Sequence, residues 1–236
     1  GLRGYGTTEA FAGAPIGTAA GQRVSGTSAL QIMRSGSQPQ TVASHDTGSQ
    51  LLTLSPRNSA LSAGDLAIVC NFSQASLFQV SAADASTVSH GTGGTPGNCS
   101  RGLGFANPPD CSETGQTYRF EANAVVMRLE SLAWYVGNTG RTSTTSRSLY
   151  RVAPQNEAGT LSLVTEEVLD GVIDLQLDYL IEGGSAYVAA SAVTDWNAVT
   201  GVRMRLTIEE PDRPAAVTDR VRRTMTHVVT LRNRMS

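Results

Sequence analysis

Alternating apolar and polar residues dominate the last third of the chain, residues 161–236. This period of two predicts strands that have one face against a core and one face in water. The predicted strands lie within Val164–Ile181, Thr200–Glu209 and Arg222–Arg232. Their expected inward residues are Ile173, Leu175, Leu177, Tyr179 and Ile181, then Val202, Met204, Leu206 and Ile208, and finally Met225, Val229 and Leu231. Residues 161–236 are therefore expected to form a strand-rich C-terminal region.

The rest of the chain predicts shorter strands joined by polar loops. They lie at Ala29–Met33, Gln50–Leu54, Leu66–Phe72, Ser76–Ala82, Tyr118–Tyr135 and Ser148–Val152. The third and fourth of these are separated by three residues and predict a β-hairpin. Residues 1–28 are expected to form a loop or a frayed helix end, and Thr194 or Asp195 is expected to cap a short helical turn at 193–199. With no repeat and no linker, we expect one strand-dominated domain over residues 1–236.

Several phrases of the sequence resemble PilW-type minor pilins of bacterial type IV pili. The C-terminal phrases are EEVLDGVIDLQLDY, AVTDWNAVTGVRMRLTI and RRTMTHVVTLRNR, and the central ones are GDLAIVCNFSQASLFQV, LAWYVGN and SRSLYRV. The resemblance covers most of the chain. It implies a type IV pilin-like α+β head with antiparallel sheets and little helix, whose long N-terminal helix has been cut away ahead of Gly1.

The same resemblance implies an assembly protein rather than an enzyme. Such subunits join other minor pilins and the major pilin, prime pilus assembly and stay at the pilus tip. The N-terminal helix anchors them in the inner membrane, with the head in the periplasm, until assembly carries them outside the cell. Free strand edges are the expected contacts with neighbouring subunits. The alternatives are a minor pseudopilin of type II secretion, or an adhesin or DNA receptor at the tip.

Charge gives little support for nucleic-acid binding. All 18 basic residues are arginine, and the formal net charge is −2, so the whole molecule does not attract nucleic acid. The one basic cluster contains Arg220, Arg222 and Arg223. It lacks the aromatic residues on which single-stranded bases stack. We therefore favour ion pairs with the acidic residues of segment 209–212, and keep DNA or an acidic patch on a neighbouring pilin as alternatives.

The two tryptophans are candidates for core or interface positions, because aromatic residues often anchor interfaces. Trp134 lies in an apolar segment and is expected in the core. Trp196 precedes a predicted strand, and core packing and interface anchoring are equally good interpretations of it. The candidate interface residues are Trp196, Arg220, Arg222 and Arg223.

The three cysteines predict one disulfide. Cys99 and Cys111 flank a loop rich in glycine, proline and asparagine within residues 90–117, where a crosslink would stabilise the fold by about 3 kcal/mol. Cys70 lies in an apolar run and is expected to be a buried free thiol. Sequence alone does not fix connectivity, so pairing of Cys70 with either of the others stays open.

Candidate catalytic groups do not assemble into a recognisable site. His45 and His90 are expected in loops, and His227 in the core or at a sheet edge. Glu166, Glu167 and Asp170 are expected on the solvated face of a helical turn. The sequence contains no nucleophile elbow, no Walker A motif and no EF-hand loop, and its cysteines lack the spacing of a zinc site. We therefore predict no catalytic residue, no cofactor and no metal.

Overall fold

The computed structural model describes residues 1–56, 60–108, 110–141, 146–210 and 221–231. The strands are β1 (Leu2–Tyr5), β2 (Ala29–Ser35), β3 (Gln40–Asp46), β4 (Leu51–Ser55), β5 (Leu66–Cys70), β6 (Ala75–Gln79), β7 (Ala82–Ala83), β8 (Thr87–Ser89), β9 (Val125–Asn138), β10 (Arg147–Glu157), β11 (Thr160–Asp170), β12 (Val172–Ile181), β13 (Tyr187–Ala189), β14 (Val199–Glu209) and β15 (Arg222–Thr230). Two 3-10 helices, η1 (Ala190–Ala192) and η2 (Trp196–Ala198), are the only helices in the described ranges.

The prediction of a strand-dominated fold with antiparallel sheets is confirmed. The strands pair into one 11-stranded and one 4-stranded sheet, and the pairings between named strands are antiparallel. Among the described residues, no helix has the length and apolar content that a bilayer crossing requires.

Contacts along the chain separate it into two compact units. Unit 1 contains Gly1–Met33, Ser131–Ala153 and Leu163–Ser236, and unit 2 contains Arg34–Glu130 and Pro154–Ser162. The unit boundaries fall within β2, β9, β10 and β11, so these strands contribute residues to both units. The expectation of one domain over residues 1–236 stays a prediction.

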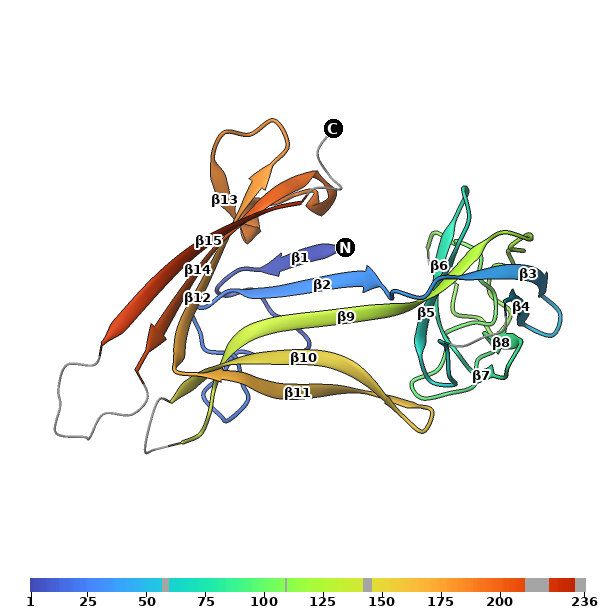
Figure 1. The fold of residues 1–236 in the computed structure, drawn as a ribbon, viewed down its shortest axis with the longest axis horizontal. Coiled ribbons are helices and arrows are strands. Elements are labelled where there is room, and N and C mark those ends of the chain that lie inside the picture. The colour runs from blue at the N-terminus through green and yellow to red at the C-terminus, as the bar shows by residue number, and fades with distance from the viewer. Residues whose placement is uncertain (57–59, 109, 142–145, 211–220, 232–236) are drawn as a thin grey trace. The chain divides into compact units, whose positions relative to one another are not determined.

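Unit 1 is built from two sheets that share a core. Strands β1, β2, β9, β10 and β11 pair in that order, and the second sheet has the order β13-β12-β14-β15 (Figure 1). Side chains from both sheets meet in one apolar cluster, whose buried members include Leu2, Val136, Val172, Leu175, Leu177, Tyr179, Val199 and Val202. The inward positions expected for Val164–Ile181 are confirmed where the buried residues Leu175, Leu177 and Tyr179 alternate along β12.

Tyr179 packs closely against β1, and the sequence allows it because residue 4 is glycine. A Cβ atom at Gly4 would lie 1.8 Å from the Tyr179 hydroxyl oxygen. Residues 2–5 therefore form an edge strand, not the helix end that was one expectation for this segment. In the segment between β1 and β2, Arg23 is fully buried. Its Nη2 atom donates hydrogen bonds to the carbonyl oxygens of Gly6 and Glu9 at 2.8 and 2.9 Å.

Unit 2 is organised around the first residues of β9. Strands β3 and β5 pair with β9, and β4, β8 and β7 continue from β3. The predicted hairpin is confirmed as β5–β6, with Cys70 opposite Ala75. The core of unit 2 contains Val42, Leu52, Val69, Phe78, Val80, Val88, Phe120 and Val126.

Two sequence-based expectations in the strand region are wrong. Glu166 and Glu167 lie in β11 and not in a helical turn, because ion pairs across the sheet hold this polar segment extended. The Glu166 Oε2 atom lies 2.6 Å from Arg151 Nη2, and Glu167 Oε2 lies 3.0 Å from Arg141 Nη1. Trp134 is only half-buried, because its neighbours in β9 occupy the core-facing positions.

Candidate interaction surface

Strand β15 forms one edge of the four-stranded sheet. Among the described residues only β14 pairs with it, in antiparallel register. Two backbone hydrogen bonds fix the phase of this ladder. The Glu210 N–H donates to the Val221 carbonyl oxygen at 3.2 Å, and the Leu231 N–H donates to the Thr200 carbonyl oxygen at 2.8 Å.

This phase decides which backbone groups point to the open edge. Alternate residues of an antiparallel strand bond to the same neighbour. Because residues 221 and 231 bond to β14, the odd-numbered residues of β15 do so as well, and the even-numbered residues direct their N–H and C=O groups away from it. The outward-directed residues are Arg222, Thr224, Thr226, Val228 and Thr230.

The apolar side chains of β15 are uncovered. Met225 lies opposite Leu206 and Val229 lies opposite Val202, so both have the core-side facing that the sequence predicted. Their predicted burial is wrong, however, because all of β15 is exposed and no described element covers this face. Met225, Val228 and Val229 are 52%, 51% and 44% exposed. Apolar residues are thus exposed on both faces of an edge strand, which is unusual in a protein that works alone.

A shallow groove of about 470 Å³ lies at the Arg222 end of β15. Ile208, Glu210, Val221, Arg223 and Met225 line it. Within the described part of the chain, no carboxylate pairs with Arg223. The groove therefore combines apolar surface with one arginine that is available to pair with an acidic group of another molecule.

Most other arginines on this sheet already have acidic partners. Arg222 Nε lies 2.9 Å from Glu209 Oε2, which confirms the expected pairing of the cluster with the 209–212 segment for this residue. Glu209 is only 5% exposed, and this ion pair and the pairing of β14 with β15 help to cover it. Arg203 pairs with Asp178 at 2.8 Å. Arg220, the third member of the predicted cluster, lies outside the described residues.

Trp196 is packed on the core of unit 1 and is partly buried. Its ring meets the Tyr179 ring edge to face, with centroids 4.9 Å apart. Asp195 caps the helical turn that begins at Trp196, as expected, by accepting a hydrogen bond from Asn197 N–H at 2.8 Å. Trp196 precedes β14, whereas Arg222 and Arg223 pair with the other end of β14, about 30 Å away at 3.3 Å per residue. Of the predicted interface residues that the structure describes, Trp196 therefore lies apart from Arg222 and Arg223.

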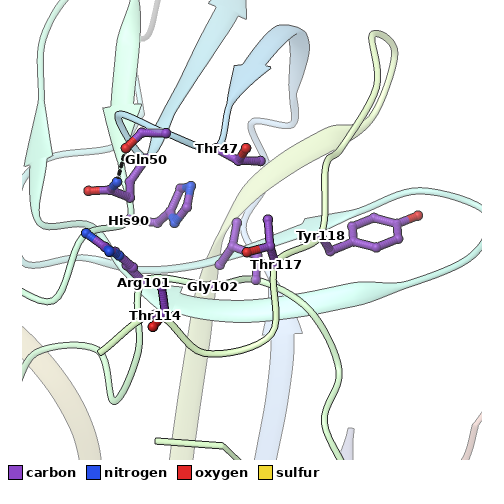
Figure 2. A pocket seen from close by; sticks show the side chains of 10 residues that line it. Thr47, Gln50, His90, Arg101, Gly102, Thr114, Thr117 and Tyr118 are labelled. Carbon is purple, nitrogen blue, oxygen red and sulfur yellow. Dashed lines mark hydrogen bonds between the residues drawn. The ribbon is translucent and has the colours of Figure 1, made fainter. Parts of the chain in front are cut away.

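Two of the three histidines, His45 and His90, contradict their sequence-based assignments, whereas His227 lies at a sheet edge, one of its two expected places. His45 lies in β3 and His90 directly follows β8, and they are 3% and 2% exposed rather than in open loops. Their Nε2 atoms are 2.9 Å apart (Figure 2 shows His90). A β-bulge between Val42 and Ser44 breaks the alternation of β3, so period-two reasoning could not place His45 inward. His227, expected in the core or at a sheet edge, is exposed on the edge strand β15.

Burial lowers the pKa of both buried histidines. The pKa of His90 falls to about 4, first because burial penalises the charged ring and second because His45 lies beside it. Burial also lowers the pKa of His45, and the positive charge of Arg119 adds to this effect. Both rings are therefore neutral at pH 7.

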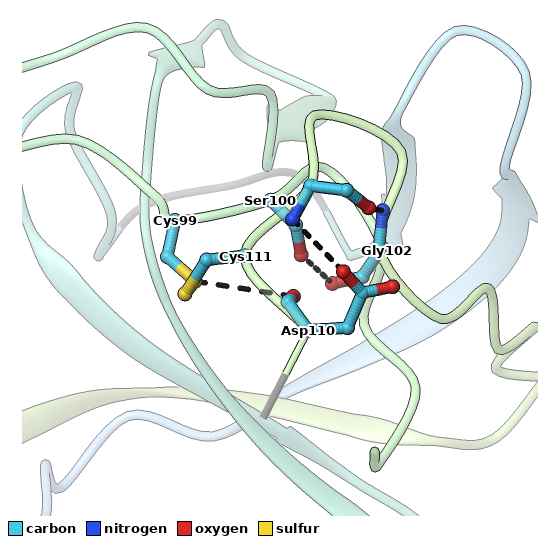
Figure 3. Close-up of a disulfide and its surroundings, with 7 residues drawn as sticks. Cys99, Ser100, Gly102, Asp110 and Cys111 are labelled. Carbon is cyan, nitrogen blue, oxygen red and sulfur yellow. Dashed lines mark hydrogen bonds between the residues drawn. A yellow bond between two sulfur atoms is a disulfide. The ribbon is translucent and has the colours of Figure 1, made fainter. Parts of the chain in front are cut away.

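The predicted disulfide joins Cys99 and Cys111, whose Cα atoms are 4.9 Å apart (Figure 3). Cys70 is free, as expected, but it is half-buried rather than buried. The loop that follows Cys99 is also held by backbone hydrogen bonds, from Arg101 N–H to Glu113 O at 3.0 Å and from Gly104 N–H to Gln116 O at 2.7 Å. The disulfide and these backbone hydrogen bonds thus hold together the two halves of the irregular segment between Cys99 and Gln116.

Comparisons with known proteins add no relative to these observations. The chain matches no protein-family model, no curated protein and no solved structure.

Proposed function

We propose that this chain is the head of a structural subunit that assembles with other subunits through the open edge of β15. The observation that carries the proposal is the exposed row of Met225, Val228 and Val229 on an edge strand whose outward backbone groups lack a described strand partner. An extended segment added at this edge would satisfy those groups and bury the apolar side chains.

The sequence of β15 makes this edge suited to pairing. Proteins that must stay monomeric protect edge strands with charged residues, proline, bulges or a covering element. Residues 224–230 (TMTHVVT) contain no proline, lysine, arginine or carboxylate, and most of them favour strands. Short uncharged segments of this kind pair readily with other strands when they are exposed. A partner strand in an assembly is therefore the occupant we favour.

The more specific proposal is a PilW-type minor pilin of the type IV pilus. It is supported by the phrases that resemble this family, and three of these supply β12, β14 and β15. In this proposal the chain is a pilin-like α+β head. Before assembly the subunit is held at the inner membrane, its head joins other minor pilins in the periplasm, and the complex then primes assembly and remains at the pilus tip.

Replacement of Thr226 by proline tests the edge directly. Its N–H points to the open edge, so proline removes a donor that a partner strand needs and leaves the β14 ladder intact. We expect Thr226→Pro to weaken binding to the heads of the other pilus subunits at least tenfold. Light scattering after size exclusion, followed by calorimetry, measures the complex and its affinity.

Thr226→Ala is the matched control, because it removes the same side chain and keeps the N–H group. It should bind within about twofold of the unchanged protein. Equal binding by the alanine and proline variants would exclude pairing at this edge. A melting temperature that falls in parallel with binding in Thr226→Pro would also contradict the proposal, because the strand itself would then be disrupted.

Arg223→Glu is the charge variant that fits the structure best. Arg223 lines the groove without a described acidic partner, whereas Arg222 neutralises the buried Glu209. Reversal at Arg223 should lower affinity for an acidic partner surface without lowering stability. Trp196→Ala should instead destabilise the head, because Trp196 packs on Tyr179. Unfolding in urea separates these two effects.

A further inference from the structure

A second concave site lies within unit 2 and is unrelated to β15. It has a volume of about 150 Å³, and the residues that line it include Thr47, Gln50, His90, Arg101, Thr114 and Thr117 (Figure 2). Ten residues line the pocket; they contribute one arginine and no carboxylate. A pocket with these groups favours a small anion over a cation.

The hydrogen bonds of the two buried histidines fix where their protons lie. The Phe120 N–H donates to His45 Nδ1 at 3.0 Å, so this nitrogen carries no proton. A neutral His45 must then carry its proton on Nε2, which donates to His90 Nε2 at 2.9 Å. The proton of neutral His90 therefore lies on Nδ1. The Phe120 N–H, acting through His45, thus makes His90 Nδ1 a hydrogen-bond donor.

This donor makes no hydrogen bond of good geometry, although the backbone carbonyl groups of Arg101 and of His90 itself lie near the ring. His90 is 2% exposed, and its Nδ1 atom is buried without a hydrogen bond in the described structure. A buried donor without a well-placed acceptor is destabilising, so such groups in native proteins usually have a water or a ligand as partner. His90 lines the pocket, so a ligand acceptor that approaches the ring there would give this proton a partner of better geometry.

Arg101 supplies the positive charge of the pocket. Among the described residues it makes no ion pair, so its guanidinium is available to donate hydrogen bonds to a ligand. The Cys99–Cys111 disulfide and the Arg101 N–H···Glu113 O bond hold its backbone. Gly102 allows the loop to approach its other half, since a Cβ there would lie 2.3 Å from the Gln116 carbonyl oxygen. The wall that carries Arg101 is therefore built before any ligand arrives.

We propose that this pocket binds a small carboxylate, held by the Arg101 guanidinium and the Nδ1–H of His90, with threonine hydroxyls at its sides. A carboxylate carries one negative charge, matches the planar arginine with two oxygens and keeps lone pairs for further donors. A phosphate dianion would leave one charge without a partner in a pocket with one cation. The disulfide loop thus acts as a ligand-binding loop, independently of assembly at β15.

The test is a titration of the whole chain, labelled with ¹⁵N-histidine, with sodium acetate and sodium glucuronate. Glucose serves as the uncharged analogue of glucuronate. We expect saturable shifts of the His90 Nδ1 resonance with at least one carboxylate and none with glucose. Absence of saturation with both carboxylates, or an equal response to glucose, would overturn the proposal.

Arg101→Gln assigns the binding to this pocket. It should weaken carboxylate binding at least tenfold, whereas Arg34→Gln, which removes the same charge from another surface of unit 2, should change it less than twofold. Equal losses in both variants would show a general charge effect and contradict a built site. If Arg101→Gln alters the fold, Thr117→Val provides a second variant that changes the pocket wall. Carboxylate affinity that is unchanged in both variants would exclude the pocket as the binding site.

Discussion

Strands β12 and β15 belong to the same sheet and carry similar alternating patterns, but only β12 is buried. Strand β12 pairs with β13 and β14, and residues of the first sheet such as Leu2 and Val136 cover its inner face. Strand β15 pairs with β14 alone within the described ranges, and every residue along it is exposed. A period of two along a strand therefore predicts which way its side chains face, whereas their burial depends on which element lies opposite that face.

Replacing one apolar side chain on each strand by alanine should give the largest difference in the free energy of unfolding. Leu177 on β12 is 4% exposed, and Met225 on β15 is 52% exposed. Leu177→Ala should cost about 2–5 kcal/mol, because it removes packed methyl groups and leaves a cavity. Met225→Ala should change the free energy of unfolding by less than about 0.5 kcal/mol. Urea denaturation measures both, and similar losses would show that β15 is covered in the isolated chain.

The same contrast between covered and uncovered groups extends to the histidines and predicts acid sensitivity. The pKa of His90 in the folded protein is lowered to about 4, below that of an unfolded histidine. The unfolded chain therefore binds the proton first as the pH falls, and the stability present above about pH 6.5 is lost toward pH 4. The loss should reach about 2 kcal/mol between pH 6.5 and 5.

Urea denaturation at several pH values between 7 and 5 checks this slope. His90→Asn should flatten it, because the group that binds the proton only on unfolding has been removed. His227→Gln, at the uncovered position on β15, is the control for loss of a histidine. A slope that persists unchanged in His90→Asn would assign the acid sensitivity to other groups.

The capping of η2 predicts a smaller effect. Asp195 accepts a hydrogen bond from Asn197 N–H and positions the turn that carries Trp196 against the core. Asp195→Ala should destabilise the head by about 1 kcal/mol, as loss of a cap usually does. Asp195→Asn keeps an acceptor oxygen and should lose less than half of that. Equal thermal shifts in the two variants would mean that the side-chain oxygen does not support the turn.

Much of the fold was predictable because local pattern and tertiary structure agree there. The inward residues of β12, the β5–β6 hairpin, the Asp195 cap and the Cys99–Cys111 pair all follow from residues close in sequence. The failures have long-range causes. The extended form of β11 depends on arginines about 15 and 26 residues earlier. The His45–His90 pair joins residues 45 positions apart, and a bulge hides the inward phase of β3.

The candidate sites were less predictable for the same reason. Sequence indicated that β15 faces the core, but it could not show that no described element lies against it. The pocket in unit 2 combines a loop arginine with a histidine that was assigned to an open loop. Its donor character depends on the Phe120 N–H, 75 residues from His45. No periodicity or motif reports such a chain of hydrogen bonds.

The smallest change in stability, and a selective change in association, is expected for Val228→Glu. Val228 lies opposite Arg203 on the outer face and is 51% exposed, so a glutamate should alter the free energy of unfolding by less than about 0.5 kcal/mol. A charge on an edge strand nevertheless discourages pairing with another chain. The isolated protein should therefore associate weakly at high concentration, and Val228→Glu should reduce that association.

Light scattering over a concentration series measures this effect. Ala12→Glu adds the same charge at an exposed loop position of unit 1 and is the matched control. If both variants reduce association equally, net charge rather than the edge limits it. If neither does, the open edge of β15 does not pair with a second copy, and the contrast with β12 then concerns only what covers each strand within one molecule. A loss of association confined to Val228→Glu would show that the uncovered strand β15 is also the strand that pairs with a second molecule.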